Sequence, residues 1–234
     1  MVAVYGNLVV ALLVTGVFAG LAYALGMVSR GGALGGFAVG AVIYVCLGPQ
    51  GFAALALFVV GGSALTRLGY RSKQRRGIAQ SHGGRRGVKN ALANCGVALL
   101  CALLAASFPS EVFTAAFTAS LGAAFADTAE SEVGQLGRRT PRLVTNLRKV
   151  PPGTDGAVSV PGTLAGLAAA GLTALIGLAL GLVGGPGAAL LVALAAFLGT
   201  VVDSFVGALA PRVGNEITNV LCTLVAAGLV LALA

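Results

Sequence analysis

The sequence has few charged residues and no tryptophan. Asp, Glu, Lys and Arg make up only 9% of its 234 residues, whereas 57% are hydrophobic. A soluble domain normally carries roughly 25% charged residues, so this chain has too little polar material to cover a surface that faces water. The composition excludes an ordinary soluble domain and is typical of a protein solvated mainly by lipid.

Long hydrophobic runs provide the expected membrane crossings. About 17–25 apolar residues are needed for a helix to cross a bilayer core of about 30 Å. The chain has runs near this length at roughly 4–26, 31–48, 51–67, 90–108, 110–127, 160–183, 187–207 and 217–234. We therefore expect an all-α polytopic integral membrane protein of about eight transmembrane helices. Residues 1–234 are predicted to form one catalytic domain, with structured loops at 67–90, 127–161 and 207–217.

The positive charges lie on one side of this predicted topology. The net charge is +8, which in a soluble protein would suggest binding to nucleic acid. Here Arg30, the runs 67–89 and 138–149 and Arg212 fall on one side, while the opposite loops contain no Lys or Arg. Lys and Arg mark the cytoplasmic side of membrane proteins. We therefore expect a protein of the cell membrane with a cytoplasmic active site, both termini outside and no nucleic-acid partner.

Several familiar catalytic motifs are missing. The single histidine, His82, has no companion GxSxG, so a nucleophilic triad is not indicated. The GxxxxGK[ST] sequence of a P-loop is also absent. The four cysteines lie within apolar runs without metal-site spacing, as small buried residues do. The basic run 67–90 is interpreted first as a topology anchor on anionic lipid.

The acidic residues, in contrast, are concentrated in two loops. Six of the seven lie in the stretches 127–163 and 203–219: Asp127, Glu130, Glu132, Asp155, Asp203 and Glu216. Asp127 and Glu130 share a helix face, and with Asp203 they could supply the hard oxygen ligands that suit Mg²⁺. The alternative is that these carboxylates form salt bridges to Arg138, Arg139 or Arg212.

Basic and amide side chains surround the acidic groups in sequence. Arg148 and Lys149 precede a turn containing Gly153, Thr154, Asp155 and Gly156, and such a turn can cradle a phosphate. The pairs Asn90/Asn94 and Asn215/Asn219 begin apolar helices, where they could cap helices, join them or bind a polar head group. Together these residues suit phosphoryl transfer, which needs positioning and charge neutralisation more than a protein nucleophile.

Three segments carry a resemblance to a known family. They are GIAQSHGGRRGVKNALAN at 77–94, the acidic block at 127–163 and DSFVGALAPRVGNEITN at 203–219. With the helix pattern between them, the chain resembles the phytyl-phosphate kinase family of prenyl-lipid salvage. That family is described as converting a polyprenyl monophosphate to the diphosphate, with CTP as the usual donor. The chain departs from the family at Ala129, where an aromatic residue is usual, so packing there is expected to differ.

The resemblance implies roles for individual residues. Asp127, Glu130, Glu132 and Asp203 would hold Mg²⁺, and Asp127, Glu130, Lys149 and Asp203 would carry catalysis. Nucleotide and phosphate binding would fall to Arg138, Arg139, Arg148, Lys149, Gly153, Thr154, Asp155, Gly156, Asn90, Asn94, Asn215 and Asn219. A looser likeness to CDP-diacylglycerol synthase, at the Lys-x-x-Pro-Gly-like loop, is analogy only but also points to CTP.

The predicted function is a Mg²⁺-dependent kinase that uses CTP to phosphorylate phytyl or geranylgeranyl phosphate at the membrane interface. A CDP-lipid-forming cytidylyltransferase, which attacks the α-phosphate, is the nearest alternative. A transporter of phosphorylated metabolites would use the acidic residues as coupling sites, but the polar residues gather at one face and no clear inverted repeat is visible. A non-catalytic scaffold would leave the acidic clustering unexplained.

Overall fold

A computed structural model describes residues 2–137 and 140–234, which are mainly helical. The elements, in chain order, are α1 (Val2–Ala24), α2 (Arg30–Arg67), α3 (Tyr70–Arg75), the 3₁₀ helix η1 (His82–Gly84), α4 (Val88–Ser107), α5 (Glu111–Gly134), β1 (Arg142–Leu143), β2 (Ala157–Val158), α6 (Val160–Ala179), α7 (Pro186–Leu209) and α8 (Asn215–Leu233). The two short strands pair antiparallel, with Arg142 opposite Val158.

The helices have the length and composition of membrane spans. Within the described residues, α2, α4, α5, α6, α7 and α8 are each long and apolar enough to cross a bilayer, and α1 adds a shorter apolar stretch at Leu8–Ala24. Large apolar side chains are exposed on the outside of the bundle; Leu34 is 73% exposed and Leu175 is 64% exposed. Such a surface is stable in lipid rather than in water. The predicted fold class, an all-α polytopic membrane protein, is confirmed.

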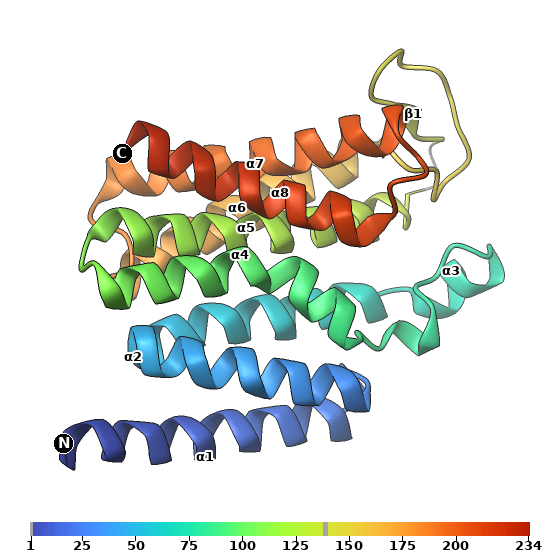
Figure 1. Cartoon of the computed structure of the whole chain (residues 1–234). Coiled ribbons are helices and arrows are strands. Elements are labelled where there is room, and N and C mark those ends of the chain that lie inside the picture. The colour runs from blue at the N-terminus through green and yellow to red at the C-terminus, as the bar shows by residue number, and fades with distance from the viewer. Residues whose placement is uncertain (1, 138–139) are drawn as a thin grey trace.

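Helix α2 folds back on itself at Gly48. Gly48 has φ +68° and ψ −165°, and Pro49 follows it. A straight helix of 38 residues would be about 57 Å long, yet the guanidinium of Arg67 donates to the carbonyl of Leu25, five residues before α2 begins. The two legs therefore run antiparallel (Figure 1). They correspond to the runs predicted at 31–48 and 51–67, so each of the eight predicted apolar runs is helical.

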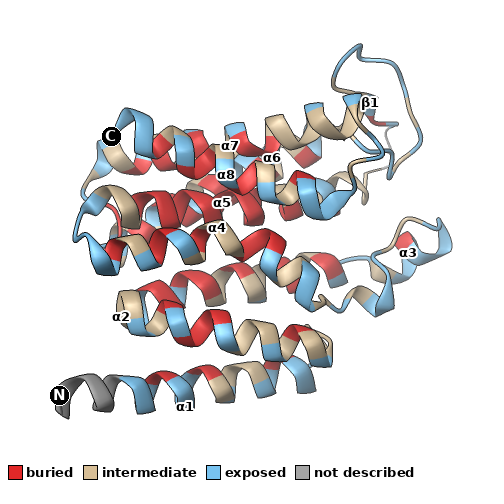
Figure 2. Cartoon of the chain, in the orientation of Figure 1, coloured by how far each residue is buried: buried red, intermediate tan, exposed pale blue. Residues whose placement is uncertain are grey.

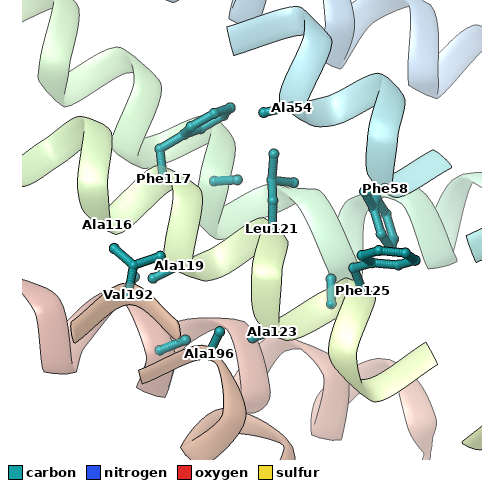
Figure 3. Packing of buried hydrophobic residues seen from close by; sticks show 14 of the residues in the cluster. Ala54, Phe58, Ala116, Phe117, Ala119, Leu121, Ala123, Phe125, Val192 and Ala196 are labelled. Atoms are coloured by element: carbon teal, nitrogen blue, oxygen red, sulfur yellow. The ribbon is translucent and has the colours of Figure 1, made fainter. Parts of the chain in front are cut away.

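Helix α5 lies at the centre of the bundle. It packs against α2, α4, α6, α7 and α8, and most of its length is buried (Figure 2). Its buried side chains alternate small and large; Figure 3 shows Phe117, Leu121 and Phe125 beside several alanines. Small residues let helices approach closely within a bilayer. Because α5 is held on all sides, the acidic residues near its C-terminal end are held in fixed positions.

The polar loops gather at one end of the bundle. Figure 1 shows α3 and β1 at this end, while the starts of α1 and α5 and the end of α8 lie at the opposite end. The C-terminal ends of α5 and α7 and the N-terminal ends of α4 and α8 therefore meet beneath the loops. This arrangement agrees with the predicted sorting of polar loops to one side.

Candidate active site

A cavity of about 1440 Å³ lies under the loops at this end of the bundle. Its walls combine the ends of α4, α5, α7 and α8 with the loops that follow α3 and β1. Most of the sequence-predicted site residues line it: Asn90, Asn94, Asp127, Glu130, Glu132, Gly153, Thr154, Asp155, Gly156, Asp203, Asn215 and Asn219. The fold thus brings together residues that are more than 120 positions apart in the chain.

Two helices supply the carboxylates. Asp127 and Glu130 lie on α5, and Asp203 lies on the neighbouring α7. Glu130 is held from a third helix, because the hydroxyl of Thr163 on α6 donates to its Oε1 at 3.1 Å. One oxygen of Asp203, Oδ1, is buried and has no hydrogen-bond partner among the described residues. A buried carboxylate oxygen without a donor is costly, so this atom is suited to receive a cation or a donor from a ligand.

The carboxylates fit Mg²⁺ by their chemistry. Carboxylate oxygens are the ligands that Mg²⁺ prefers, and Asp203 Oδ1 is buried without a partner beside the cavity. In the described part of the chain, no three His, Cys, Asp or Glu side chains converge closely enough to hold a metal by themselves. Mg²⁺ usually binds through one or two carboxylates together with substrate phosphates. The observed arrangement is therefore compatible with a metal that enters with a nucleotide.

Glu132 forms an ion pair that the sequence did not predict. Its Oε2 forms an ion pair with the ammonium of Lys73 on α3, and the two side chains are 3% and 1% exposed. Lys73 also donates to the carbonyl of Thr66 at 3.1 Å, at the end of α2. Glu132 borders the cavity and joins α3, α2 and α5 through Oε2, while its Oε1 is buried without a hydrogen-bond partner among the described residues. The helix does not unwind there, so Glu132 points away from the face shared by Asp127 and Glu130.

Arg86 brings a positive charge to the cavity wall. Its guanidinium donates to Asn90 Oδ1 at 3.1 Å and to Thr128 Oγ1 at 3.2 Å, and its Cζ lies 5.8 Å from the centre of the Phe58 ring. Burial lowers the pKa of Arg86, while the charges of Glu132 and Asp127 act in the opposite direction. Arginine nevertheless stays protonated in proteins, so Arg86 is a fixed cation beside the carboxylates.

The predicted asparagines come from two helix starts. On α4, Asn94 is 2% exposed and its Nδ2 donates to the backbone carbonyl of Asn90 at 2.9 Å. On α8, Asn215 and Asn219 line the same cavity. Asn90 accepts from Arg86 as described, so the α4 pair orients that cation as well as lining the cavity.

The predicted glycine-containing turn also borders the cavity. Thr154 donates through its backbone N–H and its hydroxyl to the carbonyl of Pro151, at 3.3 and 2.7 Å. Gly156 has φ +73°, and a Cβ there would clash with Ala208 and the carbonyl of Ser204 on α7. Only glycine combines this backbone conformation with so close an approach. The turn is thereby pressed against α7, near Asp203.

The remaining predicted residues lie elsewhere. Arg148 and Lys149 are exposed on the loop after β1 and are not among the residues that line the cavity. Lys149 instead pairs through its backbone with Arg142. Arg138 and Arg139 lie outside the described residues. The phosphate-binding roles of these four residues stay predictions.

Sequence reasoning missed two contributors from the basic run 67–90. Lys73 and Arg86 were interpreted as part of a topology anchor, but one is buried in an ion pair and the other lines the cavity. For Arg86 a signal was present in the four-residue spacing of Arg86, Asn90 and Asn94, although Arg86 precedes α4 and reaches the pair through its hydrogen bond to Asn90. For Lys73 no local signal exists, since its partner is 59 residues away.

The fold and the site define an integral membrane bundle with a charged cavity at one end. The chain belongs to the family described as integral membrane protein DUF92, whose family model matches residues 13–220. It is 37% identical over 198 residues to an uncharacterized membrane protein of Synechocystis, covering 82% of this chain and 76% of the relative.

Two further relatives widen the comparison. The chain is 34% identical over 186 residues to protein VTE6, chloroplastic, of Arabidopsis thaliana, covering 77% of this chain and 55% of the plant protein. It is also 34% identical over 197 residues to an uncharacterized membrane protein of Methanocaldococcus jannaschii, covering 83% and 80%. These matches support the predicted membership of the phytyl-phosphate kinase family. No solved structure matches the chain.

Proposed function

We propose that the protein is a membrane-bound prenyl-phosphate kinase that uses CTP and Mg²⁺ to convert phytyl or geranylgeranyl phosphate to the diphosphate. The observation that carries the proposal is that Asp127, Glu130, Asp203 and Arg86 all lie in the wall of one cavity, which is placed where apolar helices end. Such a wall can hold polyphosphate while the lipid tail stays among the helices. Membership of the phytyl-phosphate kinase family supports a prenyl phosphate as the substrate.

The size of the cavity supports a reaction between two substrates. Sites for a single small molecule usually measure roughly 300–1,000 Å³, whereas this cavity measures about 1440 Å³. A nucleoside triphosphate and a phosphate head group could therefore occupy it together. Phosphoryl transfer depends on holding these two groups in line.

The chain's own residues have distinct tasks in this mechanism. Asp127, Glu130 and Asp203 would hold Mg²⁺, which when bound neutralises phosphate charge. Arg86 and the asparagines of α4 and α8 would orient the anionic groups, and the Gly153–Gly156 turn would confine them from the α7 side. No strong general base is required, because a lipid monophosphate is already an anionic nucleophile.

Product analysis tests the proposal directly. Purified full-length protein in detergent is given geranylgeranyl or phytyl monophosphate, Mg²⁺ and γ-labelled CTP, and the lipid products are separated. We expect the label in the prenyl diphosphate, because the lipid phosphate attacks the γ-phosphorus and CDP leaves. Release of labelled pyrophosphate together with a CDP-lipid would instead establish a cytidylyltransferase, and absence of turnover with any nucleotide would contradict both enzymes.

The proposed orientation places the cavity on the cytoplasmic side. Starting from a variant without native cysteines, His82→Cys marks the loop end and Gly185→Cys marks the opposite end. A membrane-impermeant thiol reagent applied to intact cells is expected to label position 185 and to reach position 82 only after the membrane is opened. The reverse pattern would put the cavity outside, and labelling of both positions in intact cells would contradict a spanning bundle.

A further inference from the structure

A second, apolar cavity adjoins the polar one. It measures about 60 Å³ and lies between α1, the two legs of α2 and α4. Its walls are almost entirely carbon, and three aromatic rings contribute to them: Phe18, Phe52 and Phe58. Thr15 also lines it, but its hydroxyl donates to the carbonyl of Ala11 at 2.6 Å and is already satisfied. A cavity with such walls stays dry and favours an apolar occupant.

The two cavities meet at one short segment. Arg86, Gly87 and Asn90 line both of them. The Arg86 backbone is fixed there, since its N–H donates to the carbonyl of Met27 and its carbonyl accepts from the N–H of Ser29, at 3.2 and 3.0 Å. Its two described side-chain hydrogen bonds leave further N–H donors of the guanidinium free. A cation therefore stands between the apolar cavity and the polar one.

This junction matches the chemistry of a lipid monophosphate. Such a lipid changes from hydrocarbon to dianion within one bond, and the wall changes from aromatic and aliphatic carbon to arginine over the same short distance. The guanidinium is matched to a phosphate in charge and geometry. A neutral or zwitterionic bilayer lipid would interact less strongly with the guanidinium of Arg86.

We propose that the apolar cavity holds the isoprenoid unit next to the phosphate of the lipid substrate, and that Arg86 holds this phosphate so that it faces the polar cavity. This inference rests on the proposed function and adds the place of the acceptor lipid. The small volume fits the first part of the chain, and the rest of the tail continues along the exposed apolar faces of α1 and α2.

Gly36 gives a way to fill the cavity without disturbing the bundle. It lines the cavity on the first leg of α2, and a Cβ added there would have no other atom within 4 Å. Gly36→Leu should therefore occupy the space that the isoprenoid needs. Gly228 on α8 is also helical with open space around it, and it lines neither cavity. Gly228→Leu is therefore a matched control, and Gly36→Ala is a milder variant.

The test measures binding independently of turnover. Full-length protein is photolabelled with a geranylgeranyl monophosphate analogue that carries a diazirine on its phosphate-proximal unit, and cross-linked peptides are identified by mass spectrometry. We expect labels on the segments 15–22, 32–39, 52–59 and 91–95, suppressed by excess geranylgeranyl monophosphate. Labelling should fall roughly tenfold or more in Gly36→Leu, because the leucine side chain takes the space of the isoprenoid unit in the cavity. It should be unchanged in Gly228→Leu.

The outcomes separate this inference from the proposed function. Competed labels that fall on α6, α7 or α8, or labelling that Gly36→Leu does not reduce, would overturn the tail site even if the kinase assay succeeds. Competed labels in the predicted segments would support the site even if no nucleotide gives turnover, in which case the proposed function alone fails. Equal suppression by uncharged geranylgeraniol would overturn the role of Arg86.

Discussion

Replacement of Asp127 by asparagine is expected to lower the proposed Mg²⁺-dependent turnover by on the order of 10²–10³-fold, the usual cost of removing one preorganised electrostatic contact. The substitution keeps the size of the side chain and removes its charge. Asp127 lines the cavity on the most enclosed helix of the bundle, so packing fixes its position. The measurement is the initial rate across a series of Mg²⁺ concentrations, together with the thermal unfolding midpoint in detergent.

Glu111 supplies the matched control. It lies on the same helix as Asp127, but in the first turn at the opposite end, and it is exposed. Glu111→Gln removes an equal charge from α5 and should leave both the rate and its Mg²⁺ dependence unchanged. Full activity of Asp127→Asn with the wild-type dependence on Mg²⁺ would contradict the assignment of this carboxylate. Equal losses in both variants would indicate a structural effect of charge on α5.

The membrane architecture could be predicted from the sequence because hydrophobic run length is a local property. Each apolar run became helical, including the two legs of α2, because Gly48 and Pro49 interrupt the hydrophobic pattern where the chain turns. The sequence could not show that the legs fold back to bring Arg67 beside Leu25, since that contact spans 42 residues. The central position of α5 was not predicted either, although α5 is the least apolar of the six candidate spans in the described residues.

The candidate site also has features that could be predicted from the sequence and features that could not. Acidic and amide residues at helix ends could be predicted to converge, because helices of similar length that cross a bilayer bring their polar ends to the same level. What could not be predicted is the direction in which a loop side chain points. Lys149 is exposed on the loop after β1, whereas Lys73 is buried in an ion pair with a carboxylate far along the chain.

The second large effect is expected at that buried ion pair. Lys73→Met would leave the Glu132 carboxylate buried without a counter-charge, which costs about 3–5 kcal/mol in globular proteins. For a chain of this length, we expect the thermal unfolding midpoint to fall by roughly 10 °C. Glu132→Leu should cause a loss of similar size, because Lys73 would then be buried beside the α2 carbonyls alone. Thermal unfolding of each variant in detergent measures these changes.

The double variant Lys73→Met/Glu132→Leu decides what Glu132 does. Replacing both members of a buried pair by apolar residues is often neutral, so we expect the double variant to unfold near the wild-type temperature. Its loss of stability should be smaller than the sum of the two single losses. If Glu132 serves only to join α3 and α2 to α5, turnover returns together with stability. If Glu132 is a metal ligand, as its place in the acidic block predicts, stability returns while turnover stays absent. Single losses that simply add would contradict the ion pair itself.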